Sequence, residues 1–498
     1  MQALPQLITH GLPSYRKSPQ MLRSLHLDVA LPELILAGGA LVLLMLGVAT
    51  RRERGELILW LAIILLALAG IFVASGEGTI TLFYKSFIVD PFARTLKLLT
   101  LAGAAVALLM SVDYWRGAGG VRFEFPVLVL LATTGMLMMI SANDLIALYV
   151  GLEQQSLALY VVAAFQRDSA RSSEAGLKYF VLGALSSGML LYGASLVYGF
   201  TGSTGFAAIA IASKAAQAGQ NIGLIIGLVF VLVGLAFKVS AVPFHMWTPD
   251  VYEGAPTPIT AFFSAAPKAA AAGLLMRLTL SAFGGMGPQW QQVISALAIA
   301  SMGLGAFAAI GQSNIKRLLA YSAIGNIGYM LIGLAAASPE GARGMILYLV
   351  IYVVMTLGAF ACVLCMRRPS GMVEDIGELA GLAQSNLGLA SMFALLLFSL
   401  AGVPPLAGFL AKFYVFVAAV KEGMWPLAIF GVLASVVGAY YYVRIVKVMF
   451  FDAPREAFLR VPFKAGLVLG SAGMFVLLYV VWPAPLVEGA GAAAATLF

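Results

Sequence analysis

Long apolar runs follow one another along most of this chain, and only short polar gaps separate them. A helix needs about 20 apolar residues to cross the hydrocarbon core of a bilayer, so each run is a candidate transmembrane helix. Charged residues make up 10% of the 498 residues, whereas about 25% is usual in a soluble domain. The sequence therefore predicts an all-α polytopic membrane protein.

We expect about fourteen spans, at residues 29–49, 57–75, 91–112, 124–141, 143–165, 175–199, 221–243, 258–280, 290–311, 316–336, 342–366, 387–418, 425–450 and 463–483. Lys and Arg are concentrated in every second gap, at 51–54, 116–122, 167–171, 316–317, 367–368 and 444–464. The positive-inside rule makes these gaps cytoplasmic, which places both termini on the periplasmic side of a bacterial inner membrane. Residues 1–27 form a polar N-terminal tail whose basic residues run against the rule, and either Met1 or Met21 could be the start.

Prolines interrupt two of the predicted spans. Pro243 ends the apolar run of the seventh, and Pro404 and Pro405 divide the twelfth. Proline removes a backbone hydrogen bond, and broken helices at matching places in two halves are typical of inverted-repeat transporters. We therefore predict two inverted five-helix repeats, at 124–280 and 290–450. The first three helices precede them at 28–123, and the last helix and the C-terminus follow at 451–498.

Four ionisable residues lie deep in the predicted spans. Glu153 is the only carboxylate well inside a span, and Lys238 lies near the break of the seventh span. Lys268 is central in the eighth span, and Lys412 follows the double proline of the twelfth. A charge at the bilayer centre costs about 2.5–3.5 kcal/mol on insertion scales, so these side chains require an explanation.

Two explanations are open. In the first, Glu153 and Lys238 form a buried ion pair, and the other lysines extend to the membrane surface. In the second, the four groups exchange protons, because removal from water disfavours the charged form of a lysine and chains of such groups form proton relays. One glutamate cannot pair with three lysines, and Lys268 is too central to reach the surface. The sequence therefore favours the relay.

Other ionisable residues give weaker signals. His245 and Glu253, in the loop expected after the seventh span, could feed protons to Lys238 or could simply fold that loop. Lys178 and Arg277 lie near span ends, where we expect them to extend to the surface. The role of Lys97, inside the third span, is left open.

The chain is expected to hold no cofactor and no metal. Its two cysteines, Cys362 and Cys365, are too few for an iron–sulfur cluster, which usually needs four thiolates. They are better interpreted as small apolar residues on one buried helix than as a redox or metal motif. Neither a Walker lysine loop nor a dinucleotide fingerprint is present. The net charge of +8 lies in the gaps between spans, so it does not indicate nucleic-acid binding.

Four stretches resemble chain N of bacterial respiratory complex I, the proton-pumping NADH:quinone oxidoreductase. They are VGLEQQSLALYVVAAFQRDSARSSEAGLKYFVLGALSSG, GLAFKVSAVPFHMWTPDVYEGAPTPITAFFSAAPKAA, NIKRLLAYSAIGNIGYMLIGL and AGVPPLAGFLAKFYVF. The resemblance extends from about residue 28 to the end. It implies an antiporter-like fold of fourteen helices with two inverted repeats. It also implies that Glu153 pairs with Lys238, that Lys268 is the central lysine, and that Lys412 faces the outer exit.

The same resemblance implies partners. NADH, FMN, iron–sulfur clusters and quinone would belong to other subunits of the complex. The chain would contact the antiporter-like M chain, the small K and J chains, the peripheral NADH-oxidising arm and membrane lipid. Two alternatives are a subunit of a multi-chain sodium/proton antiporter, which shares this fold, and a purely structural membrane scaffold.

Overall fold

The computed structural model describes residues 27–50, 54–217 and 221–498. The predictions for the N-terminal tail and for the start site therefore lie outside the described residues.

The helices are α2 (Leu31–Ala49), α3 (Gly55–Ala74), α4 (Pro91–Gly117), α5 (Glu124–Ile140), α6 (Leu145–Ala163), α7 (Ala170–Thr201), α8 (Phe206–Gln217), α9 (Ile222–Val239), α10 (Trp247–Gly254), α11 (Thr257–Arg277), α12 (Gly287–Ile310), α13 (Ile315–Ala335), α14 (Pro339–Cys365), α15 (Leu382–Ser385), α16 (Leu387–Ala401), α17 (Ala407–Lys421), α18 (Trp425–Phe451), α19 (Phe463–Val481) and α20 (Ala484–Ala495). A π-helical turn continues α11 over Leu278–Ala282, and 3₁₀ turns lie at Gly284–Met286 and Ile376–Leu379. Two antiparallel hairpins pair β1 (Ile80–Leu82) with β2 (Phe87–Val89), and β3 (Arg367–Arg368) with β4 (Gly371–Met372).

Every predicted span corresponds to helical structure. Twelve helices of the described residues are long and apolar enough to cross a membrane. The shorter α5 corresponds to the fourth span, and the twelfth span is divided into α16 and α17. A helix in lipid satisfies its own backbone hydrogen bonds, so a local apolar pattern is enough to predict it. The predicted all-α fold with about fourteen spans is confirmed.

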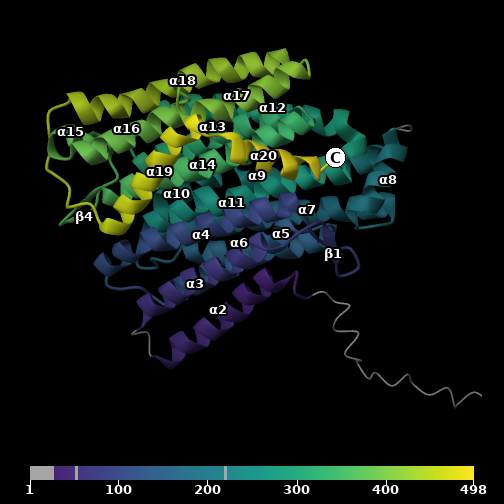
Figure 1. Cartoon of the computed structure of the whole chain (residues 1–498), viewed down its shortest axis with the longest axis horizontal. Helices are drawn as coiled ribbons and strands as arrows, with labels where there is room; N and C mark the ends of the chain where they lie inside the picture. The colour runs from purple at the N-terminus through teal and green to yellow at the C-terminus, as the bar shows by residue number, and fades with distance from the viewer. Residues whose placement is uncertain (1–26, 51–53, 218–220) are drawn as a thin grey trace, which may run out of the picture.

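The short elements were not predicted. Residues 247–254, expected to be part of a loop, form α10, whose residues Trp247, Val251 and Tyr252 are buried. α8 and α20 also lie outside the predicted spans. Figure 1 shows the long helices side by side in one bundle, with α2 and α3 at one edge and α18 at the other.

The centre of the bundle is formed by α11, α13 and α14. All of the apolar span that begins at Thr257 is buried, as are 94% of the span of α13 and 89% of that of α14. Only 33% of the spans of α2, α3 and α18 is buried. The helix that carries Lys268 is therefore enclosed by protein on all sides.

The start of α6 crosses the segment that follows α7. Asp144 caps α6 by accepting hydrogen bonds from the N–H groups of Ile146 and Ala147, at 2.7 and 3.3 Å. On either side of this cap, the N–H of Leu145 donates to Thr204 O (2.9 Å) and the N–H of Phe206 donates to Asn143 O (3.1 Å).

The start of α13 makes the same crossing with the segment that follows α14. Asn314 caps this helix through the N–H groups of the second and third residues after it. The N–H of Ile315 donates to Glu374 O (2.8 Å), and the N–H of Ile376 donates to Ser313 O (2.8 Å). The two crossings occupy the same place in the two predicted repeats. They support our proposal of repeats at 124–280 and 290–450, with 28–123 before them and 451–498 after them.

Glycines bring the first two helices of each proposed repeat into backbone contact. A Cβ atom on Gly135 of α5 would lie 2.4 Å from the N atom of Gln155 in α6. A Cβ atom on Gly305 of α12 would lie 2.6 Å from the N atom of Gly325 in α13. Neither distance leaves room for a side chain, so the two helix pairs pack by the same close approach.

Two buried ion pairs involve the first three helices, and one of them connects these helices to the rest of the bundle. Arg277 was expected to extend to the surface, but its side chain is 2% exposed and binds both carboxylate oxygens of Asp90, at 2.8 and 2.9 Å. Lys97 of α4 lies 2.6 Å from the carboxylate of Glu33 on α2, and both are buried. Lys178 reaches Asp250 at 2.8 Å while remaining partly exposed. Arg277 is thus held inside the protein by a carboxylate that lies 187 residues away in the sequence.

The Asp90–Arg277 pair allows a test of this fold. Asp90→Asn keeps the cap that the side chain provides to Ala93 N–H but leaves the guanidinium without its counter-charge. Removing one partner of a buried ion pair costs about 3–5 kcal/mol, so the thermal unfolding temperature of the detergent-solubilised chain should fall clearly. Asp90→Asn combined with Arg277→Met should recover part of the loss. Asp452→Asn, in an exposed pair with Lys447, is the control, and an equally small effect at both sites would contradict the prediction.

Candidate functional site

Lys238 lies at the last turn of α9, where the helix ends because Ser240 adopts a left-handed conformation with φ of 67°. Its side chain is buried, and its ammonium group donates a hydrogen bond to Ser156 Oγ of α6 at 2.7 Å. It also lies 3.5 Å from the hydroxyl of Tyr160. A helix C-terminus favours a cation, so both the helix end and the hydroxyl groups stabilise this charge.

Glu153 lies on α6, one turn before Ser156, and is only half-buried within the chain. Its carboxylate accepts a hydrogen bond from Ser187 of α7. The described residues include no ion pair between Glu153 and Lys238 within 4.0 Å. Lys238 instead reaches from α9 to Ser156, one turn after Glu153 on α6, and each of the two groups is bound to a serine hydroxyl.

Lys268 lies in the middle of α11 and is 1% exposed. Its ammonium group lies 5.3 Å from the centre of the Tyr252 ring of α10. Within the described part of the chain, this ammonium group has no hydrogen-bond partner. An unpaired buried charge is very costly, so this amine must either meet water or release its proton.

Lys412 lies in α17, beyond the break that contains Pro404 and Pro405. Its ammonium group donates to Ala401 O at 2.8 Å and to Ser435 Oγ at 2.7 Å. In a continuous helix, the N–H of residue 405 would donate to the carbonyl of Ala401, but proline has no N–H. The lysine therefore supplies the hydrogen bond that the break removes.

The break between α9 and α10 contains Pro243 and His245. The N–H of Val242 donates to Ser301 Oγ of α12 at 2.9 Å, which joins this break to the second proposed repeat. Burial lowers the pKa of His245 below its ordinary value. No hydrogen bond between His245 and Lys238 is present among the described residues. Glu253, on α10, accepts a hydrogen bond from Arg317 at 2.9 Å.

A tyrosine ring faces each of the three lysines of the predicted relay, which the sequence analysis did not foresee. Tyr160 lies 5.6 Å from Lys238, Tyr252 lies 5.3 Å from Lys268, and Tyr329 lies 4.5 Å from Lys412, measured from ammonium nitrogen to ring centre. The face of an aromatic ring attracts a cation, so each ring stabilises the protonated lysine without neutralising it. Such contacts join residues far apart in the sequence, and no local pattern marks them.

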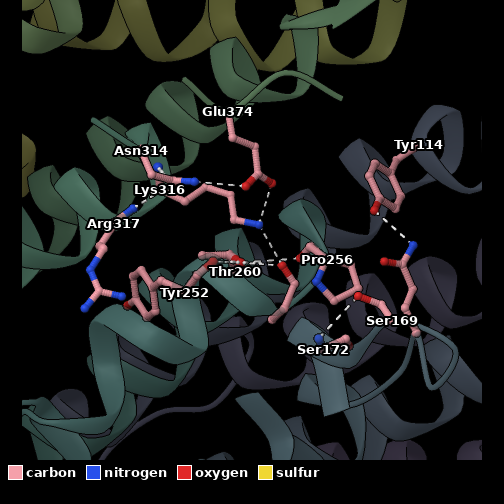
Figure 2. A network of polar contacts seen from close by, with 12 residues as sticks. Tyr114, Ser169, Ser172, Tyr252, Pro256, Thr260, Asn314, Lys316, Arg317 and Glu374 are labelled. Carbon is pink, nitrogen blue, oxygen red and sulfur yellow. Dashed lines mark hydrogen bonds and ion pairs between the residues drawn. The ribbon is translucent and has the colours of Figure 1, made fainter. Parts of the chain in front are cut away.

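The sequence analysis also missed a charge pair beside a cavity. Lys316 was counted only among the basic residues of a gap, yet it is 2% exposed and lies 2.8 Å from the carboxylate of Glu374 (Figure 2). A cavity of about 540 Å³ lies beside this pair, where α11 begins. Its lining includes Tyr114, Gln166, Glu253, Thr257, Lys316 and Glu374.

The described residues contain no group of three or more side chains that could hold a metal ion. Cys362 and Cys365 are both buried in α14 as free thiols, and the thiol of Cys365 donates to Ala361 O.

Comparisons with known proteins agree on one family. The NADH:quinone oxidoreductase/Mrp antiporter transmembrane family model matches residues 142–438. NADH-quinone oxidoreductase subunit N 1 of Rhizobium meliloti is 59% identical over 95% of this chain and 98% of its own length. The corresponding subunit N of Parvibaculum lavamentivorans is 58% identical over 94% of this chain and 97% of its own length.

Solved structures show the same fold. A chain of respiratory complex I from Thermus thermophilus, with bound aureothin, is 34% identical, with a TM-score of 0.79 over 92% of this chain and 98% of that chain. A chain of the Mrp complex from a Dietzia species has a TM-score of 0.82 over 95% of this chain and 98% of that one, but at 23% identity it shows the fold alone. This chain therefore belongs to the family of NADH-quinone oxidoreductase N subunits, the antiporter-like, proton-translocating membrane subunits of bacterial respiratory complex I.

Proposed function

We propose that this subunit carries protons outward across the bacterial inner membrane through Glu153, Lys238, Lys268 and Lys412, driven by quinone reduction elsewhere in the complex. NADH, FMN, iron–sulfur clusters and quinone bind to partner subunits, and this chain contributes no redox centre. Its neighbours are the M chain, the small K and J chains, the peripheral NADH-oxidising arm and membrane lipid; nucleic acid is not among them. Both of its termini lie on the periplasmic side.

The state of Lys268 is the observation that carries this proposal. A structural role would require a fixed positive charge with fixed partners, as Arg277 has in Asp90. The amine of Lys268 is enclosed in the central helix and contacts only the face of Tyr252 among polar or aromatic groups of the described residues. A group in that setting is suited to gaining and losing a proton rather than to holding one permanently.

A serine hydroxyl binds each member of the Glu153–Lys238 pair. Ser156 accepts a hydrogen bond from Lys238 and donates one to Leu152 O, and Ser187 donates one to Glu153. A hydroxyl group both donates and accepts, so by exchanging partners these two serines pass a proton between an amine and a carboxylate that do not touch. The missing direct contact between Glu153 and Lys238 is therefore compatible with proton transfer along α6 and α7.

The position of Lys412 suits an exit. It binds a carbonyl at a helix break, and irregular backbone at membrane depth persists only where protein or water supports it. Water that reaches this break also reaches the ammonium group. A proton that arrives from Lys268 can therefore leave there towards the periplasmic side.

Lys268→Arg tests whether titration is needed. Arginine keeps the positive charge but holds its proton, with a pKa above about 12. We expect proton transport by the purified complex in sealed vesicles to fall as far with Lys268→Arg as with Lys268→Ala. Lys447→Arg, at an exposed lysine, should leave transport unchanged. Normal transport with Lys268→Arg would show that only a charge is required.

Glu153→Gln tests whether the carboxylate of Glu153 has to exchange a proton. Glutamine can still bind Ser187 but cannot exchange a proton, so assembly should be preserved. Proton transport should fall by roughly 10²-fold, at the low end of the contribution of a positioned proton-transfer group. Vesicle acidification with NADH is the measurement, and Glu174→Gln, in an exposed ion pair with Lys178, is the matched control. Unchanged acidification in an assembled Glu153→Gln complex would exclude the role.

Two substitutions of Lys412 separate its proposed exit role from its structural contact. Lys412→Ala leaves the carbonyl of Ala401 without this donor, which costs about 1–3 kcal/mol when the group is buried. Lys412→Gln can retain a donor but does not titrate. Both variants should slow coupled NADH oxidation together with acidification, because the upstream steps stop when protons cannot leave. The exit role is wrong if Lys412→Gln supports normal rates of both in a complex shown to contain the mutant chain.

A further inference from the structure

Lys316 is not explained by the local fold around it. It lies two residues after the cap Asn314 at the second crossing, and the residue in the same place at the first crossing is Ile146, two residues after Asp144. Ile146 is 52% exposed, whereas Lys316 is 2% exposed. Since the same cap and the same crossing form with an isoleucine, neither requires a lysine. We therefore look for the role of the buried ammonium group in its contacts outside this crossing.

Two contacts hold the ammonium group of Lys316. It lies 2.8 Å from Glu374 Oε1, and it donates to the carbonyl of Ala255 at 2.9 Å. Figure 2 shows Lys316 reaching from its helix to Glu374 on one side and to the chain near Pro256 on the other. The desolvation of a buried ion pair offsets much of its attraction, so the pair is better explained by the geometry that it maintains than by stability.

Ala255 occupies the junction between α10 and α11. It ends α10, and the next residue, Pro256, begins the turn into α11. α10 carries Tyr252, whose ring faces the ammonium group of Lys268 on α11. A helix of 8 residues has little stability of its own, so its position depends on such outside contacts. Lys316 thus holds the segment that places a ring against Lys268.

Glu374, the ion-pair partner of Lys316, lines the cavity beside this junction. Glu374 is 22% exposed and lines the cavity together with Glu253 of α10 and Arg171 of α7. Asp375, next to Glu374, completes the charged lining. The cavity lies at the basic end of the bundle, which is cytoplasmic under the proposed topology. Glu374 therefore borders an open, charged cavity on one side and the buried Lys316 on the other.

We propose that Lys316 is a positioning residue for proton transfer at Lys268: through Ala255 it holds Tyr252 against that amine, and its ion pair with Glu374 keeps the lysine in place for this contact. When the ion pair is removed, the hold on Ala255 weakens. α10 can then move its ring away from Lys268. This inference rests on the proposed role of Lys268.

The first test compares Lys316→Met, Glu374→Gln and Lys447→Met in the complete complex, reconstituted in sealed vesicles. We expect Lys316→Met to lower proton transport per NADH oxidised by about tenfold, the size expected when one hydrogen bond to a charged group is lost. Oxidation of NADH with an uncoupler should stay normal. Glu374→Gln keeps the size of the side chain but removes the charge attraction to Lys316, so it should lower transport in the same direction. Lys447→Met removes a lysine from an exposed pair and should change neither readout.

The second test is a double-mutant cycle with Tyr252→Leu, which removes the ring. If Lys316 acts through Tyr252, the double variant Lys316→Met/Tyr252→Leu should transport protons no more slowly than Tyr252→Leu alone, because coupled sites are not additive. Independent, multiplying losses would overturn the proposal. If the Lys316→Met chain does not enter the complex, Glu374→Gln takes its place in the cycle with the same expectations.

The outcomes distinguish this inference from the proposed function. Normal transport with Lys268→Arg would overturn the relay and this inference together. A loss with Lys268→Arg, combined with normal transport in Lys316→Met and Glu374→Gln, would overturn the inference alone.

Discussion

The cost of an unpaired polar group in a medium without water governs the arrangement of this chain. Where α16 breaks, the carbonyl of Ala401 loses its helical partner, and the same depth holds a lysine that needs an acceptor. Each group would be costly alone, and together they satisfy one another. At the other break a neutral donor is used, because the indole of Trp247 donates to the carbonyl of Phe237 at 3.0 Å. Lys238 is then left to bind the hydroxyl of Ser156.

The same constraint distinguishes structural charges from those suited to move protons. Arg277 binds both oxygens of a carboxylate, and a guanidinium group does not release its proton. It is therefore a fixed connection between α11 and α4. Lys268, on the same helix, faces only an aromatic ring among its described neighbours. Both residues are buried, so burial alone does not separate the two kinds of charge. The difference is that Arg277 has a carboxylate as its counter-charge, whereas Lys268 has none among the described residues.

Much of this fold could be predicted from the sequence, and the reason is local. A transmembrane helix closes its own hydrogen bonds, so its apolar run and its prolines predict where it lies and where it breaks. The lysines in those runs were equally visible, because a charge among apolar residues is conspicuous. α10 was missed because a helix of 8 residues has no long apolar pattern. The burial of Lys316 was missed because its partner Glu374 lies 58 residues away, and only the folded chain brings them together.

The burial of α11 also bears on the return of protons across the membrane. Moving one proton against 100 mV takes about 2.3 kcal/mol, and each proton that slipped back would waste that energy. The apolar span of α11 is buried completely, so packed side chains surround Lys268. In the proposed relay, the same packing that isolates this amine also opposes the return of protons down the gradient. Moving the proton and holding the voltage then depend on one helix.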